Sequence, residues 1–404
     1  MGYNTRYGRG GVYGIPRSWS AKLHEYTRLS QPINLIPMTS PPTVTMGSTG
    51  AASSITSAQS VSIFNGTASQ ATINTHGKFR ISGAAPAYRL FSGNPAVQPW
   101  NINGQTGMTS ISGMHYGSAM EWILWGNGTG FYRLWIDDQP VTATMQNGTG
   151  GTNGRHYLHV NFGSSAWRRV RIDVDNQSVS GVNIGPTDTW LKDDGLDGLR
   201  LLVMSDSYGS GTGAAIASTG ESWIGVCSRL LGCRDVAVAT AGGTGLTAAG
   251  SWGTYATRFA ASAALLTSPP DVVIIQGSTN DNGATSGTIT TATSALIATI
   301  RATYPSAFIV VLGLLWDTSR LASSVTNNSE LMAAVGADLY IDTVNGAEGN
   351  WWSGTGKVGS ATGSGNGDIF MSADGIHPTT AGHQHLGSRV AARLRTAWTS
   401  LPIR

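Results

Sequence analysis

The stretch "LLVMSDSYGSG", residues 201–211, combines an apolar run with a sharp polar turn. Apolar residues pass directly into Ser205, Asp206 and Ser207, and glycines follow. A short apolar run bounded by turn residues is typical of a strand that is buried on both faces, as in a parallel sheet. The polar residues then stand at the carboxyl end of that strand, which is the edge where parallel α/β sheets place their ligands.

The chain from residue 191 to residue 404 repeats this alternation of strand and helix. The apolar strand segments are "LRLLVMS", "DVAVAT", "DVVIIQG", "AFIVVLGLLW" and "LYIDTV". Helical patterns are expected near 219–231, 252–267, 289–303, 324–336 and 379–399. Buried strands separated by helices predict a parallel sheet with helices on both faces, so we expect a three-layer αβα domain over residues 191–404.

The preceding half has a different periodicity. Between about residues 57 and 190, apolar and polar residues alternate between Gly and Asn turns, in segments such as "KFRISG", "MEWILWGNG", "RHYLHVNFG" and "AWRRVRIDVDN". This pattern predicts an all-β sandwich, jelly-roll-like, over residues 36–190, with carbohydrate binding as one interpretation. Residues 1–35 are rich in Gly, Tyr, Arg and Pro without periodicity and predict an extended arm.

Composition excludes several classes of partner. A net charge of +3 over 404 residues produces no strong field, so nucleic acid is not an expected partner. No apolar run approaches the roughly 18 residues needed to span a bilayer, and the N-terminus has no apolar core of a secretory signal. Cys227 and Cys233 fit neither a disulfide scaffold nor a four-ligand zinc site. We expect buried free thiols, with pairing between the two as the alternative.

Polar residues at four strand ends predict nucleophilic catalysis. A nucleophilic serine needs a base, a carboxylate that orients that base, and donors aimed at the developing oxyanion. Ser207, His377 and Asp374 supply the first set, because the last two lie three residues apart in "ADGIHP". The backbone amides of Ser207 and Gly243 and the side-chain amide of Asn280 supply the second set. No metal or organic cofactor is required.

The ordered blocks "SDSYG", "GGTG", "STND" and "DGIHP" resemble those of the SGNH hydrolases, also called GDSL esterases/lipases, over about residues 198–402. That resemblance implies a catalytic serine at Ser207, an oxyanion donor at Gly243 and a further one at Asn280. The repeated glycine in "AGGTG" leaves Gly242 as the fallback for the second block.

The last block of the family corresponds to Asp374 with His377. Two positions depart from the family pattern, because Ser205 and Ser278 stand where glycine is usual. Both are close-packing positions, and we expect a slightly reshaped pocket with the same catalytic assignment.

Structural readings compete with several of these assignments. Alone, Ser207 could equally cap a helix. We interpret Asp206 as a brace for its loop and Asp281 as structural. A metal pair formed by His383 and His385 is disfavoured, because residues two apart lie on different faces of a helix.

The tryptophans allow two readings each. Trp351 and Trp352 precede the last block in a long loop, where they either pack the loop or line the substrate site. Most tryptophans of the β region are expected in its core rather than on an exposed sugar-binding platform. These are Trp100, Trp122, Trp125, Trp135 and Trp167.

The sequence is compatible with three functions. The resemblance and the attached β domain favour a serine esterase that removes acetyl groups from a polysaccharide. The alternatives are a general short-chain carboxylesterase or thioesterase, and a non-catalytic glycan-binding or phage tail structural protein. The Gly-, Arg- and Tyr-rich arm suggests a phage-particle partner and an extracellular or virion-associated location, while the oligomeric state is undetermined.

Overall fold

A computed structural model of the chain describes residues 22–401 with several gaps. The residues outside the description within that range are 24, 28–29, 31, 65–76, 84–85, 92–93, 100–107, 127–129, 149–153, 176, 194–197, 212–218, 234, 265, 267, 315–320 and 347–348. Among the residues that the structure describes, no helix is long and apolar enough to cross a membrane.

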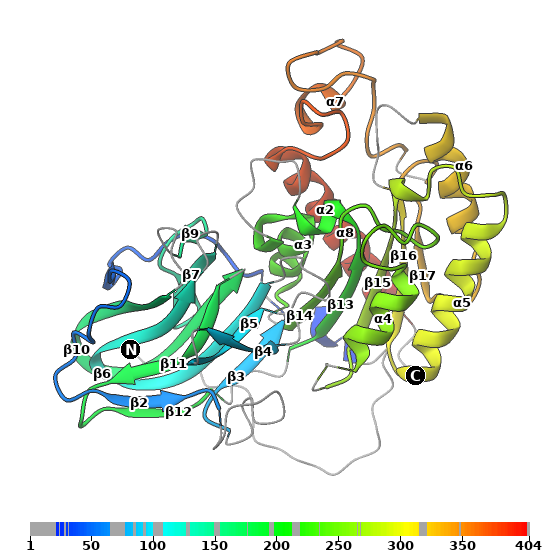
Figure 1. The fold of residues 1–404 in the computed structure, drawn as a ribbon. Helices are drawn as coiled ribbons and strands as arrows, with labels where there is room; N and C mark the ends of the chain where they lie inside the picture. The colour runs from blue at the N-terminus through cyan, green and yellow to red at the C-terminus, as the bar shows by residue number, and fades with distance from the viewer. Residues whose placement is uncertain are drawn as a thin grey trace.

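The C-terminal domain is built on a parallel five-stranded sheet in the order β14-β13-β15-β16-β17 (Figure 1). Its strands are β13 (Arg200–Ser205), β14 (Asp235–Thr240), β15 (Val272–Gly277), β16 (Phe308–Leu314) and β17 (Leu339–Ile341). Its longer helices are α3 (Trp223–Leu231), α4 (Tyr255–Ala263), α5 (Thr288–Thr303), α6 (Leu321–Met332) and α8 (Thr380–Ser400). The expected αβα domain is confirmed.

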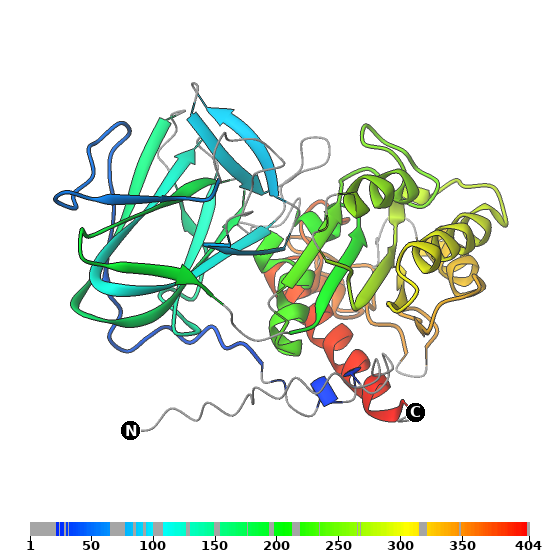
Figure 2. The ribbon, with the colours of Figure 1, turned by 90° about the horizontal axis from the view of Figure 1, so that it is seen from below.

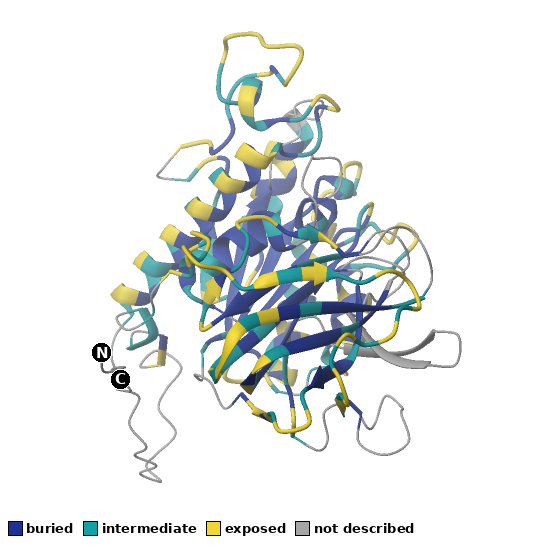
Figure 3. Ribbon diagram, turned by 90° about the vertical axis from the view of Figure 1, so that its left-hand side faces the viewer, coloured by how far each residue is buried: buried dark blue, intermediate teal, exposed yellow. Residues whose placement is uncertain are grey.

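Helices cover both faces of this sheet because successive strand residues point to opposite sides. Along β13, Leu201 and Val203 pack into a core with α3 and α8. Leu202 and Met204 pack into a second core with α4 and α5. The central strands of this sheet are almost continuously buried, whereas Figure 3 shows many exposed positions on the foreground strands of the N-terminal domain.

The N-terminal domain is an antiparallel sheet organised by two long strands, β6 (Met108–Gly126) and β10 (Gly154–Asp175), which pair with each other over most of their length. The other strands are β1 (Thr43–Met46), β2 (Gln59–Ser62), β3 (Arg80–Gly83), β4 (Pro86–Phe91), β5 (Asn94–Pro99), β7 (Phe131–Ile136), β8 (Gln139–Pro140), β9 (Gln146–Asn147), β11 (Ser178–Ile184) and β12 (Thr189–Lys192).

The structure corrects one prediction in this domain, because "RHYLHVNFG" and "AWRRVRIDVDN" form one strand rather than two. Strand β10 continues through a register break between Asn161 and Ala166, where Gly163 has φ 76°. Its first half pairs with β1 and its second half with β7. Side chains from both halves meet in one core, so a continuous sheet folds over itself as a sandwich does (Figure 2).

The described part of the N-terminal arm packs on the α/β domain. Leu23 is 1% exposed within the core that contains α3 and α8. The ammonium of Lys22 lies 2.5 Å from the carboxylate of Asp271, and the amide of Ile33 donates to the carbonyl of Arg229. Lys22, Leu23 and Ile33 therefore contact the α/β domain, while residues 1–21 lie outside the described part of the chain.

Candidate active site

Ser207 is the first residue of a four-residue helix, α2 (Ser207–Ser210), that follows directly after β13. Asp206 caps this helix, because its carboxylate accepts a hydrogen bond from the amide of Tyr208 at 2.9 Å. The cap turns the chain at the edge of the sheet. Ser207 is 8% exposed at this point.

The structure brings Ser207, His377 and Asp374 together, as the sequence predicts. The hydroxyl of Ser207 lies 2.9 Å from Nε2 of His377, and Nδ1 of the same ring lies 2.7 Å from Oδ2 of Asp374. An imidazole held between a hydroxyl and a carboxylate can accept the hydroxyl proton while the carboxylate stabilises the cation that forms.

The second carboxylate oxygen of Asp374 is also bound. It accepts hydrogen bonds from the hydroxyl of Ser372 at 2.6 Å and from the amides of Ile376 and His377 at 2.8 and 2.9 Å. Burial alone would raise the pKa of Asp374, but the hydrogen bonds from Ser372, His377 and Ile376 outweigh it and hold the pKa below its ordinary value. The carboxylate is therefore ionised at neutral pH.

A backbone hydrogen bond spans the loop that carries Asp374 and His377. The amide of Ser372 donates to the carbonyl of His377 at 2.8 Å, and Gly375 takes φ 75°, a conformation that favours glycine. The hydroxyl of Tyr208, next to the candidate nucleophile, donates to the carbonyl of Ile376. Its ring centre lies 5.9 Å from that of His377, so α2 contacts and orients this loop.

The two further candidate donors stand at neighbouring strand ends. Gly243 follows Gly242 in a turn after β14, has φ 71°, and has open space where a side chain would begin. Asn280 lies in a single turn of 3₁₀-helix, η3 (Thr279–Asp281), after β15. Its side-chain nitrogen lies 3.1 Å from both the carbonyl of Thr244 and the hydroxyl of Ser278, and these contacts orient the amide.

Asp281 has the structural role that the sequence suggests. Its carboxylate accepts hydrogen bonds from the amides of Leu246, Thr247 and Ala248 at 2.8 to 2.9 Å. This fixes the chain that follows Gly243 against the end of β15.

A buried polar network lies beneath Ser207. The hydroxyl of Ser278 donates to the carboxylate of Asp206 at 2.7 Å, and the side-chain amide of Gln276 reaches the same carboxylate at 3.3 Å. The hydroxyl of Ser205 donates to Gln276, and a guanidinium nitrogen of Arg258 donates to the carbonyl of Ser205 at 2.9 Å. The two serines that replace glycine are therefore hydrogen-bonded members of this network.

Sequence reasoning missed Gln276 and Arg258. Gln276 could have been noticed, because it is a polar residue in the strand "VVIIQG" and a polar group on a fully buried strand needs a partner. Arg258 lies on α4 and has no comparable signal in the sequence. Burial raises the pKa of Asp206, and its hydrogen bond from Ser278 acts in the opposite direction.

His383 and His385 lie outside this arrangement, as expected. His383 is buried and its Nδ1 accepts the amide of Trp223 at 3.1 Å. The ring of His385 stacks on Phe370, and its Nε2 lies 3.0 Å from the carbonyl of Trp351. Within the described residues, no group of three or more His, Cys, Asp or Glu side chains could hold a metal ion.

The exposed fraction of each described tryptophan decides between packing in a core and an exposed position. Trp351 and Trp352 are each 1% exposed and belong to the core of the α/β domain, so they pack their loop. Trp122, Trp125 and Trp135 are buried in the β domain. For Trp167 the expected core position is wrong: its side chain is 49% exposed and lies beside Tyr116 on the neighbouring strand, with ring centres 5.5 Å apart. Trp100 lies outside the described residues.

Cys227 and Cys233 are both buried and free.

Known proteins resemble this chain in family and in fold. The model of the GDSL-like lipase/acylhydrolase family matches residues 206–385. No curated protein matches the chain. A family two carbohydrate esterase from Cellvibrio japonicus aligns with a TM-score of 0.57 at 16% identity, covering 85% of this chain and 98% of that one. An acetyl xylan esterase from the rumen bacterium Butyrivibrio proteoclasticus aligns with a TM-score of 0.56 at 14% identity, covering 85% and 100%.

A salicylyl-acyltransferase from a tetracycline biosynthetic pathway aligns with a TM-score of 0.57 at 16% identity, covering 86% of this chain and all of that one. At these identities the structural matches establish the fold, including the N-terminal β domain, and not the substrate. The family match covers the segment that carries Ser207, Gly243, Asn280 and the Asp374–His377 pair. The α/β domain of this chain therefore belongs to the GDSL-like lipase/acylhydrolase (SGNH) family.

Proposed function

We propose that this protein is a serine esterase that hydrolyses short-chain esters through an acyl-enzyme, with O-acetyl groups on a polysaccharide as the substrate class. The observation that carries the proposal is the pair of contacts that joins Ser207 to His377 at 2.9 Å and His377 to Asp374 at 2.7 Å.

The reaction follows from these contacts. The oxygen of Ser207 attacks the ester carbonyl carbon while Nε2 of His377 takes the hydroxyl proton. The imidazolium is stabilised by the ionised carboxylate of Asp374. The bond from the carbonyl carbon to the alcohol oxygen then breaks, and His377 protonates the departing alcohol. Water then attacks the acyl carbon while His377 takes its proton. The bond from that carbon to the oxygen of Ser207 breaks, His377 returns the proton to Ser207, and the acid departs.

The tetrahedral intermediate carries a negative oxygen that needs fixed donors. In this proposal the backbone amides of Ser207 and Gly243 and the side-chain amide of Asn280 donate to it. Asn280 has two N–H bonds, so it can keep its contact with the carbonyl of Thr244 while the N–H that faces the hydroxyl of Ser278 turns to the oxyanion. Gly242 is the alternative donor in the same turn.

The exposure of the site supports an ester that is displayed on a polymer. The side chains of His377 and Asp374 are 15% and 40% exposed, so they lie near the surface of the described structure. A polysaccharide can bring a short acyl group to a shallow site without entering the protein. The fold shared with a carbohydrate esterase and an acetyl xylan esterase is consistent with this substrate class.

Acyl-chain length tests the proposal most directly. The enzyme is assayed with p-nitrophenyl acetate and p-nitrophenyl octanoate, and then for acetate release from acetylated xylan and acetylated mannan. We expect faster turnover of the acetyl ester, release of acetate from at least one polymer, and none of this with Ser207→Ala. Faster turnover of the octanoyl ester would instead support a general carboxylesterase.

Two further outcomes distinguish the alternatives. If the wild type releases no acid from any ester while the Ser207→Ala protein binds the glycan with unchanged affinity, the protein is a binding module. If added alcohols or sugars accept the acyl group faster than water does, the protein is an acyltransferase, an activity that the shared fold with the salicylyl-acyltransferase makes worth measuring.

A further inference from the structure

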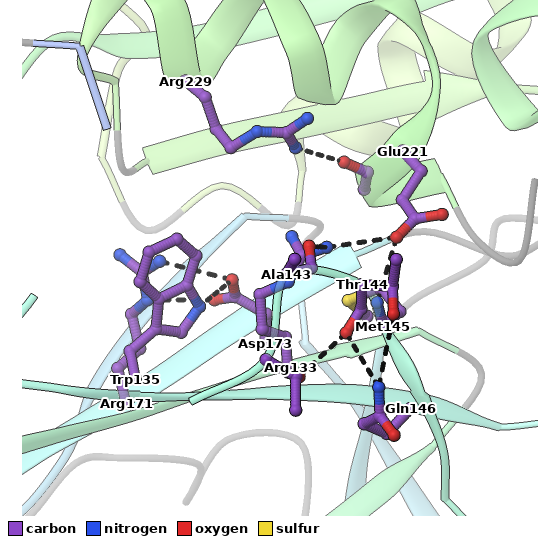
Figure 4. Close-up of polar contacts among 12 residues, drawn as sticks. Arg133, Trp135, Ala143, Thr144, Met145, Gln146, Arg171, Asp173, Glu221 and Arg229 are labelled. Carbon is purple, nitrogen blue, oxygen red and sulfur yellow. Dashed lines mark hydrogen bonds and ion pairs between the residues drawn. The ribbon is translucent and has the colours of Figure 1, made fainter. Parts of the chain in front are cut away.

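The two domains meet at a cluster of buried and half-buried charged side chains (Figure 4). The β domain contributes Arg133 from β7, and Arg171 and Asp173 from β10. The α/β domain contributes Glu221 from the 3₁₀-helix η2 (Thr219–Glu221) and Arg229 from the last turn of α3. The cluster therefore contains three guanidinium groups and two carboxylates.

Each carboxylate already has its own arginine. A guanidinium nitrogen of Arg133 lies 3.1 Å from Glu221, and Nε of Arg171 lies 3.1 Å from Asp173. Asp173 also accepts hydrogen bonds from the indole of Trp135 at 2.6 Å and the hydroxyl of Ser110 at 2.5 Å. Both oxygens of Asp173 are thus occupied by donors that hold the β domain together.

Arg229 forms no ion pair of its own among the described residues, although Glu221 and Asp173 are near enough to interact with it electrostatically. The one polar contact of its side chain with these residues is a hydrogen bond of 2.5 Å to the carbonyl of Gly220. The cluster consequently carries one positive charge more than negative, and Nε of Arg133 is buried with no hydrogen-bond partner. Arg229 is half-buried, and a partly desolvated charge without an ion pair costs free energy, so this arrangement favours an additional anion.

A small cavity lies between these side chains. Its volume is about 20 Å³, and its lining includes Arg133, Arg171, Arg229 and Asp173 together with Trp135. A space of this size holds one water molecule or one monoatomic ion.

We propose that this cavity binds a monoatomic halide ion such as chloride, which neutralises Arg229 and joins the β domain to the α/β domain. With the ion bound, the cluster contains three positive charges, from the arginines, and three negative charges, from the two carboxylates and the ion. The site is independent of the proposed esterase reaction, since none of its residues contacts Ser207, His377 or Asp374 through any described hydrogen bond or ion pair.

Bromide provides the direct test, because it replaces chloride and scatters anomalously. The full chain is crystallised with sodium bromide, and an anomalous difference map is calculated at the bromine edge. We expect a peak inside the cavity between Arg171 and Arg229. An ordered water molecule without an anomalous peak in that cavity would refute the proposal.

Thermal unfolding gives a second test in solution. Tm is measured with increasing sodium chloride or sodium bromide, with sodium gluconate added to hold ionic strength constant. A bound ion stabilises only the folded state, so we expect a saturating rise of about 2 °C or more with either halide. An equal Tm in gluconate and in halide contradicts the site.

Arg229→Gln should abolish the halide dependence of Tm. Arg168→Gln is the matched control, because the guanidinium of Arg168 also donates to a backbone carbonyl, that of Gly117, and lies outside the cavity lining. The control should keep the full halide effect. A halide effect that persists in Arg229→Gln would also contradict the proposal, and if that variant does not fold, the bromide map of the wild type decides.

Discussion

Two buried polar clusters in this molecule differ in composition and in what they connect. The cluster beneath Ser207 consists mainly of hydroxyl and amide groups around Asp206, and most of its members come from the ends of adjacent strands in one sheet. The cluster at the domain boundary consists of full charges from both domains. We infer that the first supports the geometry of a reactive side chain, whereas the second supports the association of two domains.

This comparison predicts that variants near Ser207 change rate more than stability, and that variants at the boundary do the opposite. Four of the predictions below each test one side of that contrast, and the last concerns His383, which lies outside both clusters. They run from the largest expected effect to the smallest, where a tenfold change in rate equals about 1.4 kcal/mol.

Ser207→Ala should lower kcat by about 10⁴-fold or more, because the acyl-enzyme can no longer form. Its Tm should stay within a few degrees of the wild type, since only one hydroxyl is lost. Steady-state assays with p-nitrophenyl acetate and a thermal melt measure both quantities. Residual activity above a tenth of the wild type would remove Ser207 from the mechanism.

Asp374→Asn should lower kcat by about 10³-fold with a much smaller change in KM. The amide cannot stabilise the imidazolium of His377 and favours a different ring tautomer. Ser372→Ala is the milder companion, because it removes only the hydroxyl that donates to the other carboxylate oxygen. Equal losses in the two variants would show that the hydrogen-bond pattern around Asp374, rather than its charge, is what matters.

Arg133→Met should reduce the free energy of unfolding by about 3 kcal/mol, because it leaves Glu221 without its counter-charge at the domain boundary. The kcat of the folded enzyme should change less than threefold. Arg301→Met is the matched control: its partner Asp338 is 2.6 Å away, but both side chains are partly exposed, and the expected loss is about 1 kcal/mol or less. Chemical denaturation of both variants measures the difference, and equal losses would contradict the distinction.

Ser278→Ala should lower kcat by about tenfold. It removes the hydroxyl that donates to the buried carboxylate of Asp206 and lies 3.1 Å from the side-chain nitrogen of Asn280. Ser278→Thr retains the hydroxyl and should recover part of the rate if the methyl group is accommodated. An unchanged kcat in Ser278→Ala would mean that the network beneath Ser207 has no influence on the reaction.

His383 predicts a loss of stability in acid. Burial lowers its pKa from the ordinary 6.5 to about 3. Between these values the unfolded chain binds a proton that the folded chain does not. The free energy of unfolding should therefore fall as pH decreases from 6.5 towards 3, by at most about 1.4 kcal/mol per pH unit from this residue.

His383→Asn should make this dependence shallower, because asparagine does not titrate and its side-chain oxygen can still accept the amide of Trp223. Denaturant melts at pH 7, 6, 5 and 4 give the slope. If the wild type and the variant have the same slope in this range, His383 is not the residue responsible.

Much of the α/β domain could be predicted from the sequence. The helix expected near 289–303 is observed at Thr288–Thr303, and the one near 379–399 at Thr380–Ser400. Such elements are long and strongly periodic, which makes their apolar faces visible in the sequence. The β domain was less predictable, because a glycine in a strand can mark either a turn or a register break. Gly163 lies at a register break inside the continuous strand β10.

The site was partly predictable for a different reason. Parallel strands end at one edge of the sheet, so the order of the sequence blocks was enough to expect Ser207 and Asn280 near each other. Gln276 and Arg258 were missed because their contacts join positions that are distant in the sequence. Trp351 and Trp352 had two readings, which only their measured burial could separate.

The sequence by itself determined the two domains, the alternation of strands and helices, and the polar residues at the strand ends, because these depend on local periodicity and on the direction of the strands. Only the tertiary structure decided that Ser205 and Ser278 are hydrogen-bonded network members, that Trp167 is exposed, and that Arg229 lines a cavity without forming an ion pair of its own. The physical reason is that the free energy of a buried polar group depends on its partners, and those partners are brought together by folding from distant parts of the chain.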